Sequence, residues 1–146
     1  MDWDDLPEFF AWKRQFTDNS GIWDYLYNEF TLQDITATTS IFFPNLLKRG
    51  GRVYCADGFS EENYQHWLRE LGNTPALQKL INHDHICYSL QQSNEPEDDR
   101  ICYKRLLDTM EIGWRGTLQR NYPQHKFEVV TYWDDNSTPT IVFWQQ

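Results

Sequence analysis

The stretch Leu46-Leu-Lys-Arg-Gly-Gly-Arg-Val-Tyr-Cys-Ala56 decides the fold class of this chain. Two short runs, 46–49 and 52–56, flank the pair Gly50-Gly51. A two-residue hairpin turn requires positive φ at both central positions, and glycine adopts positive φ at little steric cost. The stretch therefore predicts an antiparallel β-hairpin in the first half of the chain.

Helical patterns precede this hairpin. Pro7 suits the first position of a helix that ends near residues 19–21, and residues 22–30 carry apolar side chains at helical spacing. The segment Thr31-Leu-Gln-Asp34 is a capping-box variant, which predicts the start of a third helix that Pro44 stops. We therefore expect three short helices before the hairpin.

Helical patterns also follow the hairpin. Ser60 is placed to cap a helix through Leu71, and Thr74-Pro75 begins another helix. A long helix is predicted over about 97–122, where an apolar stripe recurs every three to four residues. The stripe consists of Tyr103, Leu107, Met110, Trp114 and Leu118.

The chain ends in a second strand pair. Residues 126–133 and 140–144 read as strands around a turn-forming segment at 134–139. Residues 86–90 suit either a strand or a helix. Segregated helices and hairpins predict an α+β fold. We expect one domain over residues 1–146, in which two hairpins form one small sheet against five or six helices.

The net charge points away from a nucleic-acid partner. The 146 residues contain 13 Lys and Arg against 22 Asp and Glu, a formal net charge of −9, and 16% are aromatic. Polyphosphate partners favour a basic face, so an acidic chain suits a basic partner better. The acidity is concentrated: residues 1–35 carry eight acids and two bases, and residues 94–99 carry four acids.

The lack of a recognisable targeting signal and the pattern of cysteines favour a cytoplasmic protein. The start Met-Asp-Trp-Asp-Asp lacks the basic residues and apolar run of a secretory signal, and the apolar stretch 35–47 is too short to span a bilayer. The cysteines Cys55, Cys87 and Cys102 are odd in number and show no Cys-x-x-Cys spacing. They read as free thiols in a reducing compartment. We expect neither a membrane partner nor a cofactor.

One cluster of residues could carry chemistry. Nucleotide-binding loops and the Gly-x-Ser-x-Gly motif are absent from the sequence. If the backbone is extended, His83, His85 and Cys87 share one face and could hold Zn²⁺. The two histidines could alternatively serve as an acid/base pair in an enzyme. If the helix that begins at Thr74 continues here, the histidines point apart and one of them ends that helix.

Acidic and aromatic side chains suggest a binding surface instead. Glu95, Glu97, Asp98 and Asp99 fall in a predicted loop and first helical turn, and Trp133 directly precedes Asp134 and Asp135. Trp3 likewise lies among acidic residues. Tyr and Trp are favoured anchors at interface centres, and opposed charges accelerate encounter. The predicted contact set for a basic protein is therefore Glu95, Glu97, Asp98, Asp99, Trp133, Asp134 and Asp135. An exposed aromatic patch would equally suit a homodimer.

Four parts of the chain carry a resemblance: the stretch from Phe30-Thr-Leu-Gln-Asp-Ile35 through Ile41-Phe-Phe-Pro44, the stretch from Phe59-Ser-Glu-Glu-Asn-Tyr64 through Trp67, Ile81-Asn-His-Asp-His85, and Pro139-Thr-Ile-Val-Phe143. They resemble a group of small acidic bacterial immunity proteins of polymorphic-toxin and contact-dependent growth-inhibition systems. The resemblance extends over most of the chain. It implies a non-enzymatic inhibitor that binds one cognate toxin domain and blocks its active site. Immunity interfaces vary, so it implies no particular site residues.

Three functional hypotheses follow. The first is a cytoplasmic immunity protein for a basic, nuclease-type toxin. The second is a metal-binding or acid/base enzyme centred on His83, His85 and Cys87. The third is an adaptor or scaffold domain whose partner is not a toxin.

Overall fold

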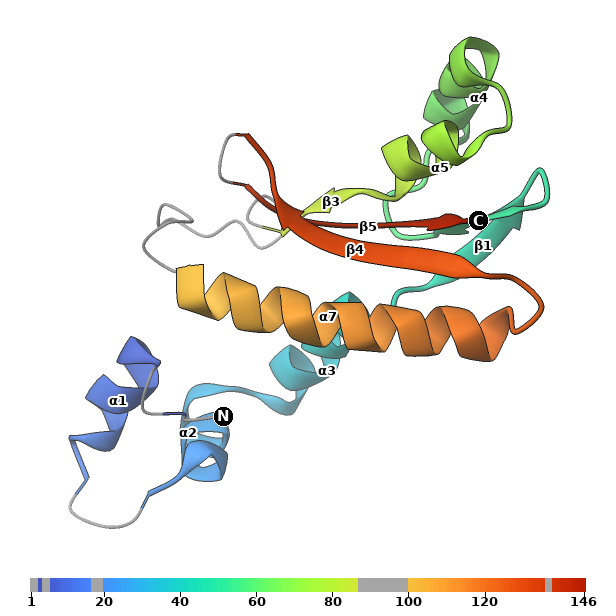
Figure 1. The fold of residues 1–146 in the computed structure, drawn as a ribbon. Coiled ribbons are helices and arrows are strands. Elements are labelled where there is room, and N and C mark those ends of the chain that lie inside the picture. The colour runs from blue at the N-terminus through green and yellow to red at the C-terminus, as the bar shows by residue number, and fades with distance from the viewer. Residues whose placement is uncertain (1–2, 4–5, 17–19, 87–99, 136–137) are drawn as a thin grey trace. The chain divides into compact units, whose positions relative to one another are not determined.

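The computed structural model describes residues 3, 6–16, 20–86, 100–135 and 138–146 (Figure 1). The contacts between Cα atoms divide the chain into two compact units, residues 1–39 (unit 1) and residues 40–146 (unit 2). No helix within the described ranges combines the length and the apolar character needed to cross a membrane.

Unit 1 is helical, as its sequence predicts. It contains α1 (Pro7–Lys13), α2 (Ile22–Glu29) and most of α3 (Leu32–Phe42). The capping box that opens α3 is confirmed, since Thr31 N donates to Asp34 Oδ2 at 2.9 Å and Asp34 N donates to Thr31 Oγ1 at 3.2 Å. Each bond satisfies a backbone N–H that has no partner within the helix.

The predicted first hairpin is present at the start of unit 2. Strands β1 (Leu46–Arg49) and β2 (Arg52–Cys55) pair antiparallel, with Arg49 opposite Arg52. Gly50 and Gly51 both have positive φ, at 58° and 84°. Two predicted helices follow, α4 (Glu61–Leu71), which is capped by Ser60, and α5 (Pro75–Asn82), which has Pro75 in its first turn.

A three-stranded antiparallel sheet forms the centre of unit 2. Its order is β3 (Asp84–His85), β5 (Pro139–Gln145) and β4 (Phe127–Trp133). Helix α7 (Arg100–Asn121) runs along one face of β4 and β5, and α5 contacts β5 from the other side (Figure 1). For the segment that contains β3, the sequence leaves an extended and a helical conformation open, and the structure has the extended one at Asp84–His85.

The main hydrophobic core lies between α7 and the sheet. All five residues of the predicted stripe on α7 are buried, together with Val129, Ile141 and Phe143 from the sheet. The end of α3 joins this core, because Trp114 Nε1 donates to Ile41 O at 2.8 Å. A second cluster, formed by Tyr54, Tyr64 and Leu77, packs α4 and α5 against the first hairpin.

The α+β class is confirmed, but the two hairpins do not share one sheet as expected. They form separate sheets, β1-β2 and β3-β5-β4. Side-chain amides connect them in place of a backbone ladder: Gln78 Nε2 donates to Val53 O at 2.7 Å, and Gln145 N donates to Gln78 Oε1 at 2.9 Å. Asn82, one helical turn further along α5, also bonds to both strands. These buried amides satisfy strand groups that would otherwise lack partners.

Candidate functional site

The most exposed aromatic side chains in the described residues lie on α2. Trp23 and Tyr27 are 80% and 85% exposed, and their i, i+4 spacing places them on one side of the helix. Leu32, at the start of α3, is also 80% exposed. Exposed tryptophan and tyrosine side chains are the types that most often anchor protein interfaces. We refer to Trp23 and Tyr27 as the aromatic pair.

The aromatic pair lies in the most acidic part of the chain. Unit 1 holds eight acidic residues and two basic ones, which gives a net charge of −6 within the first 39 residues. Its two bases lie close to aromatic rings, with Lys13 Nζ 5.8 Å from the Phe9 centroid and Arg14 Cζ 5.9 Å from the Phe10 centroid. Unit 1 therefore combines a negative field with exposed aromatic area.

Sequence reasoning did not single out the aromatic pair. The residues at helical spacing that predict this helix are Ile22, Leu26, Glu29 and Phe30. Trp23 and Tyr27 fall outside that stripe, on its flank, because successive helical positions advance by about 100° around the axis. Large aromatic side chains off the apolar stripe are the signal that could have identified them.

The side chain of Trp133 is packed against neighbouring side chains and is not free on the surface. Trp133 packs edge-to-face on Tyr103, with 6.2 Å between centroids, and Arg100 Cζ lies 4.4 Å from the Trp133 centroid. The residue is half-buried and borders the main core. Alternation along β4 accounts for this position, because Trp133 shares a face with the core residue Val129.

The two acids that follow Trp133 differ in their surroundings. Asp134 Oδ1 accepts a bond of 2.8 Å from Thr138 N across the turn, and Asp134 Oδ2 lies 4.0 Å from His85 Nδ1. Asp135 is exposed. Asp134 therefore has a local structural role, and Asp135 is the member of the pair that is available to a partner. The predicted contacts Glu95, Glu97, Asp98 and Asp99 lie outside the described residues.

The two histidines of the alternative hypothesis lie side by side. His83 ends α5 and His85 lies in β3, with 5.0 Å between their ring centroids. His83 Nδ1 lies 2.6 Å from Leu80 O, so this nitrogen carries the proton that the carbonyl accepts. His85 Nδ1 lies 2.9 Å from Thr140 Oγ1. Both line a groove of about 610 Å³ over the β4–β5 face.

The groove does not contain a complete metal site within the part of the chain that the structure describes. There, no three His, Cys, Asp or Glu side chains are placed to hold a metal ion. Cys87, the third predicted ligand, lies outside the described residues. The groove also contains Lys79, whose Nζ is 3.8 Å from the Trp144 centroid. A cation at this position opposes the binding of a second cation nearby.

Cys55 is unsuited to nucleophilic catalysis. Burial raises the pKa of its thiol to about 12, and the negative charges of Asp84 and Asp57 add to the effect. The nucleophile in cysteine chemistry is the thiolate, so a thiol with a raised pKa is unreactive near neutral pH. Cys55 lines a separate cavity of about 440 Å³ that is bordered by Met110 and Trp114.

Comparison of the chain with known proteins finds no matching protein family, no matching curated protein and no matching solved structure.

Proposed function

We propose that this chain is a non-enzymatic immunity protein that binds a basic, nuclease-type toxin domain and occludes its active site. The observation that carries the proposal is the coincidence of the aromatic pair, Trp23 and Tyr27, with the net charge of −6 in unit 1. Asp135 and the acidic segment 94–99 add negative charge elsewhere in the chain.

The charge of unit 1 favours this class of partner on physical grounds. A nuclease binds a polyanion, so the groove around its active site is basic. An acidic surface is attracted to that same groove, and electrostatic steering raises the association rate by roughly 10–10³-fold. The attraction acts on the catalytic face, where bound protein excludes the nucleic acid. Steric occlusion therefore needs no catalytic residues on the inhibitor.

The aromatic pair contributes affinity that charge alone does not supply. Exposed charged pairs add little free energy at physiological salt, whereas buried aromatic anchors dominate many interfaces. Replacing such an anchor by alanine costs about 2 kcal/mol or more, which is about 30-fold in Kd. The expected interface thus has Trp23 and Tyr27 in its centre and acidic side chains around them.

The test combines capture with neutralisation. The tagged chain is used to capture a partner from lysate of its source cells, and the captured domain is then expressed with and without this chain. We expect one basic protein whose domain stops growth alone and is tolerated when this chain is co-expressed. The double variant Trp23→Ala/Tyr27→Ala should lose protection, whereas Tyr132→Ala, at a 42% exposed tyrosine in β4, should retain it.

Two outcomes would contradict the proposal. A captured partner that is acidic or harmless to growth would exclude the immunity function. Full protection by the Trp23→Ala/Tyr27→Ala variant would remove the aromatic pair from the interface. Raising the salt concentration should slow association with the toxin, because the steering is screened over about 8 Å at physiological ionic strength.

The spacing of His83 and His85 favours one second candidate, a zinc site. The 5.0 Å between the ring centroids brings the two imidazoles together, and they would supply two of the four ligands that zinc usually takes. Protein purified without added metal should then contain stoichiometric zinc, which His83→Ala/His85→Ala would abolish. Metal-free protein that neutralises its toxin at full activity would exclude zinc from the function.

A further inference from the structure

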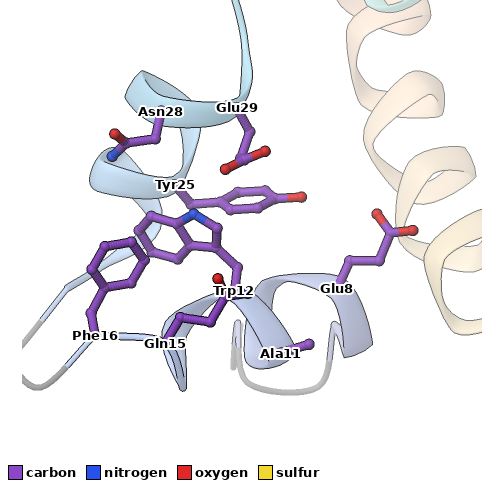
Figure 2. A pocket seen from close by; sticks show the side chains of 8 residues that line it. All are labelled: Glu8, Ala11, Trp12, Gln15, Phe16, Tyr25, Asn28 and Glu29. Carbon is purple, nitrogen blue, oxygen red and sulfur yellow. The ribbon is translucent and has the colours of Figure 1, made fainter.

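A pocket of about 620 Å³ lies between α1 and α2, within unit 1 (Figure 2). Trp12 and Phe16 reach it from the α1 side, and Tyr25 reaches it from α2. Glu8 and Glu29 contribute a carboxylate from each helix. The pocket therefore has an aromatic part and an acidic part.

The aromatic part is held in place by packing. Trp12 is 7% exposed, and Tyr25 meets its indole edge-to-face with 5.3 Å between centroids and 73° between planes. Phe16 lies on another side of Trp12, 4.6 Å away at 44°. Tyr25 is also packed against Phe9, with 5.5 Å between centroids. These contacts fix the orientation of the rings before a ligand arrives, which lowers the entropic cost of binding.

The acidic part lies beside the Tyr25 ring. Figure 2 shows that ring extending between the carboxylates of Glu29 and Glu8. The pKa of Tyr25 is raised, first by burial and then by the negative charges of Glu8 and Glu29, so both carboxylates lie within electrostatic reach of the phenol. The residues that line the pocket include neither Lys nor Arg in the described part of unit 1. The pocket therefore presents negative charge and aromatic rings without a cation of its own.

We propose that this pocket binds the guanidinium group of an arginine side chain from a basic polypeptide. Aromatic faces attract cations, and arginine stacks on them more often than lysine does. Its planar fork also bonds carboxylates in a bidentate manner, which a compact ammonium cannot do. Two carboxylates on opposite helices beside ring walls match this shape and charge. The source of the arginine, a toxin partner, rests on the proposed function; the chemistry of the pocket does not.

The experiment titrates the full chain with N-acetyl-arginine amide and follows the indole N–H signal of Trp12 by NMR. N-acetyl-citrulline amide is the neutral probe of nearly the same shape. The double variant Glu8→Gln/Glu29→Gln removes both carboxylates. Its matched control is Glu62→Gln/Glu70→Gln, which removes two exposed carboxylates from α4 in unit 2. Circular dichroism checks that both variants retain the helical content of the parent.

We expect a saturable shift of the Trp12 signal with the arginine probe and none with the citrulline probe. Glu8→Gln/Glu29→Gln should weaken binding of the arginine probe at least tenfold, and Glu62→Gln/Glu70→Gln should leave it unchanged. Equal shifts with both probes, or equal weakening in both variants, would overturn the proposal. Tighter binding of N-acetyl-lysine amide would overturn the assignment to guanidinium.

The same variants separate this inference from the proposed function. If the arginine probe binds but the captured partner is not a basic toxin, the immunity function fails and the pocket stands. If the toxin is neutralised equally well by Glu8→Gln/Glu29→Gln and the probe does not bind, the pocket fails and the immunity function stands.

Discussion

Replacement of Asn82 by alanine should weaken the connection between the two sheets of unit 2, which Gln78 and Gln145 would still join. Asn82 is 2% exposed, its Oδ1 accepts a bond of 3.1 Å from Cys55 N, and its Nδ2 donates to Phe143 O at 3.3 Å and to Val53 O at 3.2 Å. Alanine removes all three bonds. Val53 O keeps a bond of 2.7 Å from Gln78 Nε2. Two strand groups, Cys55 N and Phe143 O, therefore lose the partner that Asn82 supplies.

The size of the effect follows from these two groups. A buried donor or acceptor left without a partner costs about 1–3 kcal/mol, so the pair would cost about 2–6 kcal/mol. Asn82 lines the cavity of about 440 Å³, and water entering it would replace part of the lost bonding. We therefore expect a loss of about 2–4 kcal/mol in the free energy of unfolding. In urea this lowers the midpoint by about 1–2 M.

The assay is urea denaturation together with amide hydrogen exchange. The Cys55 amide should exchange faster in Asn82→Ala, because its acceptor is gone. Asn63→Ala, at an exposed position of α4, is the matched control and should stay within about 0.5 kcal/mol of the parent. An Asn82→Ala midpoint equal to that of Asn63→Ala, with the Cys55 amide still protected, would refute the role of this amide in joining the sheets.

The remaining predictions concern unit 2. A Cβ at Gly113 would lie 2.2 Å from the backbone O of Phe42, so Gly113→Ala should destabilise the fold by about 1–3 kcal/mol through overpacking. A Cβ at Gly116 meets nothing within 4 Å, so Gly116→Ala should instead stabilise by up to about 1 kcal/mol through helix propensity; thermal unfolding compares the two signs. Because the pKa of the Cys55 thiol is about 12, iodoacetamide at pH 8 should alkylate Cys55 in the unfolded chain but not in the folded one, as peptide mass spectrometry can show. Folding favours the neutral thiol, so this contribution to stability is complete below the unfolded pKa of about 8.5 and is lost as the pH rises through about 12.

Local rules explain which parts of the fold the sequence predicted. The turn at Gly50-Gly51, the capping box at Thr31–Asp34 and the stripe on α7 all depend on residues within a few positions of one another. The same holds for Gly72, which ends α4 with a φ of 64°. Steric preferences and hydrogen bonds act over these short distances in any context, so the sequence pattern alone predicts these turns, caps and helix faces.

The candidate sites were less predictable because their residues come together only through tertiary contacts. Alternation along β4 places Trp133 on the same face as the core residue Val129, so the sequence could have predicted that Trp133 packs against the core. The sequence could not have predicted that Tyr25 packs against Trp12, because α1 and α2 are separate helices and their packing depends on side-chain shape.

By itself, then, the sequence determined the α+β class, most of the element positions and the concentration of negative charge in the first 39 residues. The tertiary structure decided that the hairpins form two sheets, that His83 and His85 lie side by side, and that Trp12 and Tyr25 form a pocket with two carboxylates. The physical reason is the range of the interactions. Turns and caps are stabilised by neighbouring residues, whereas sheet pairing and pockets depend on which distant side chains fill the same space.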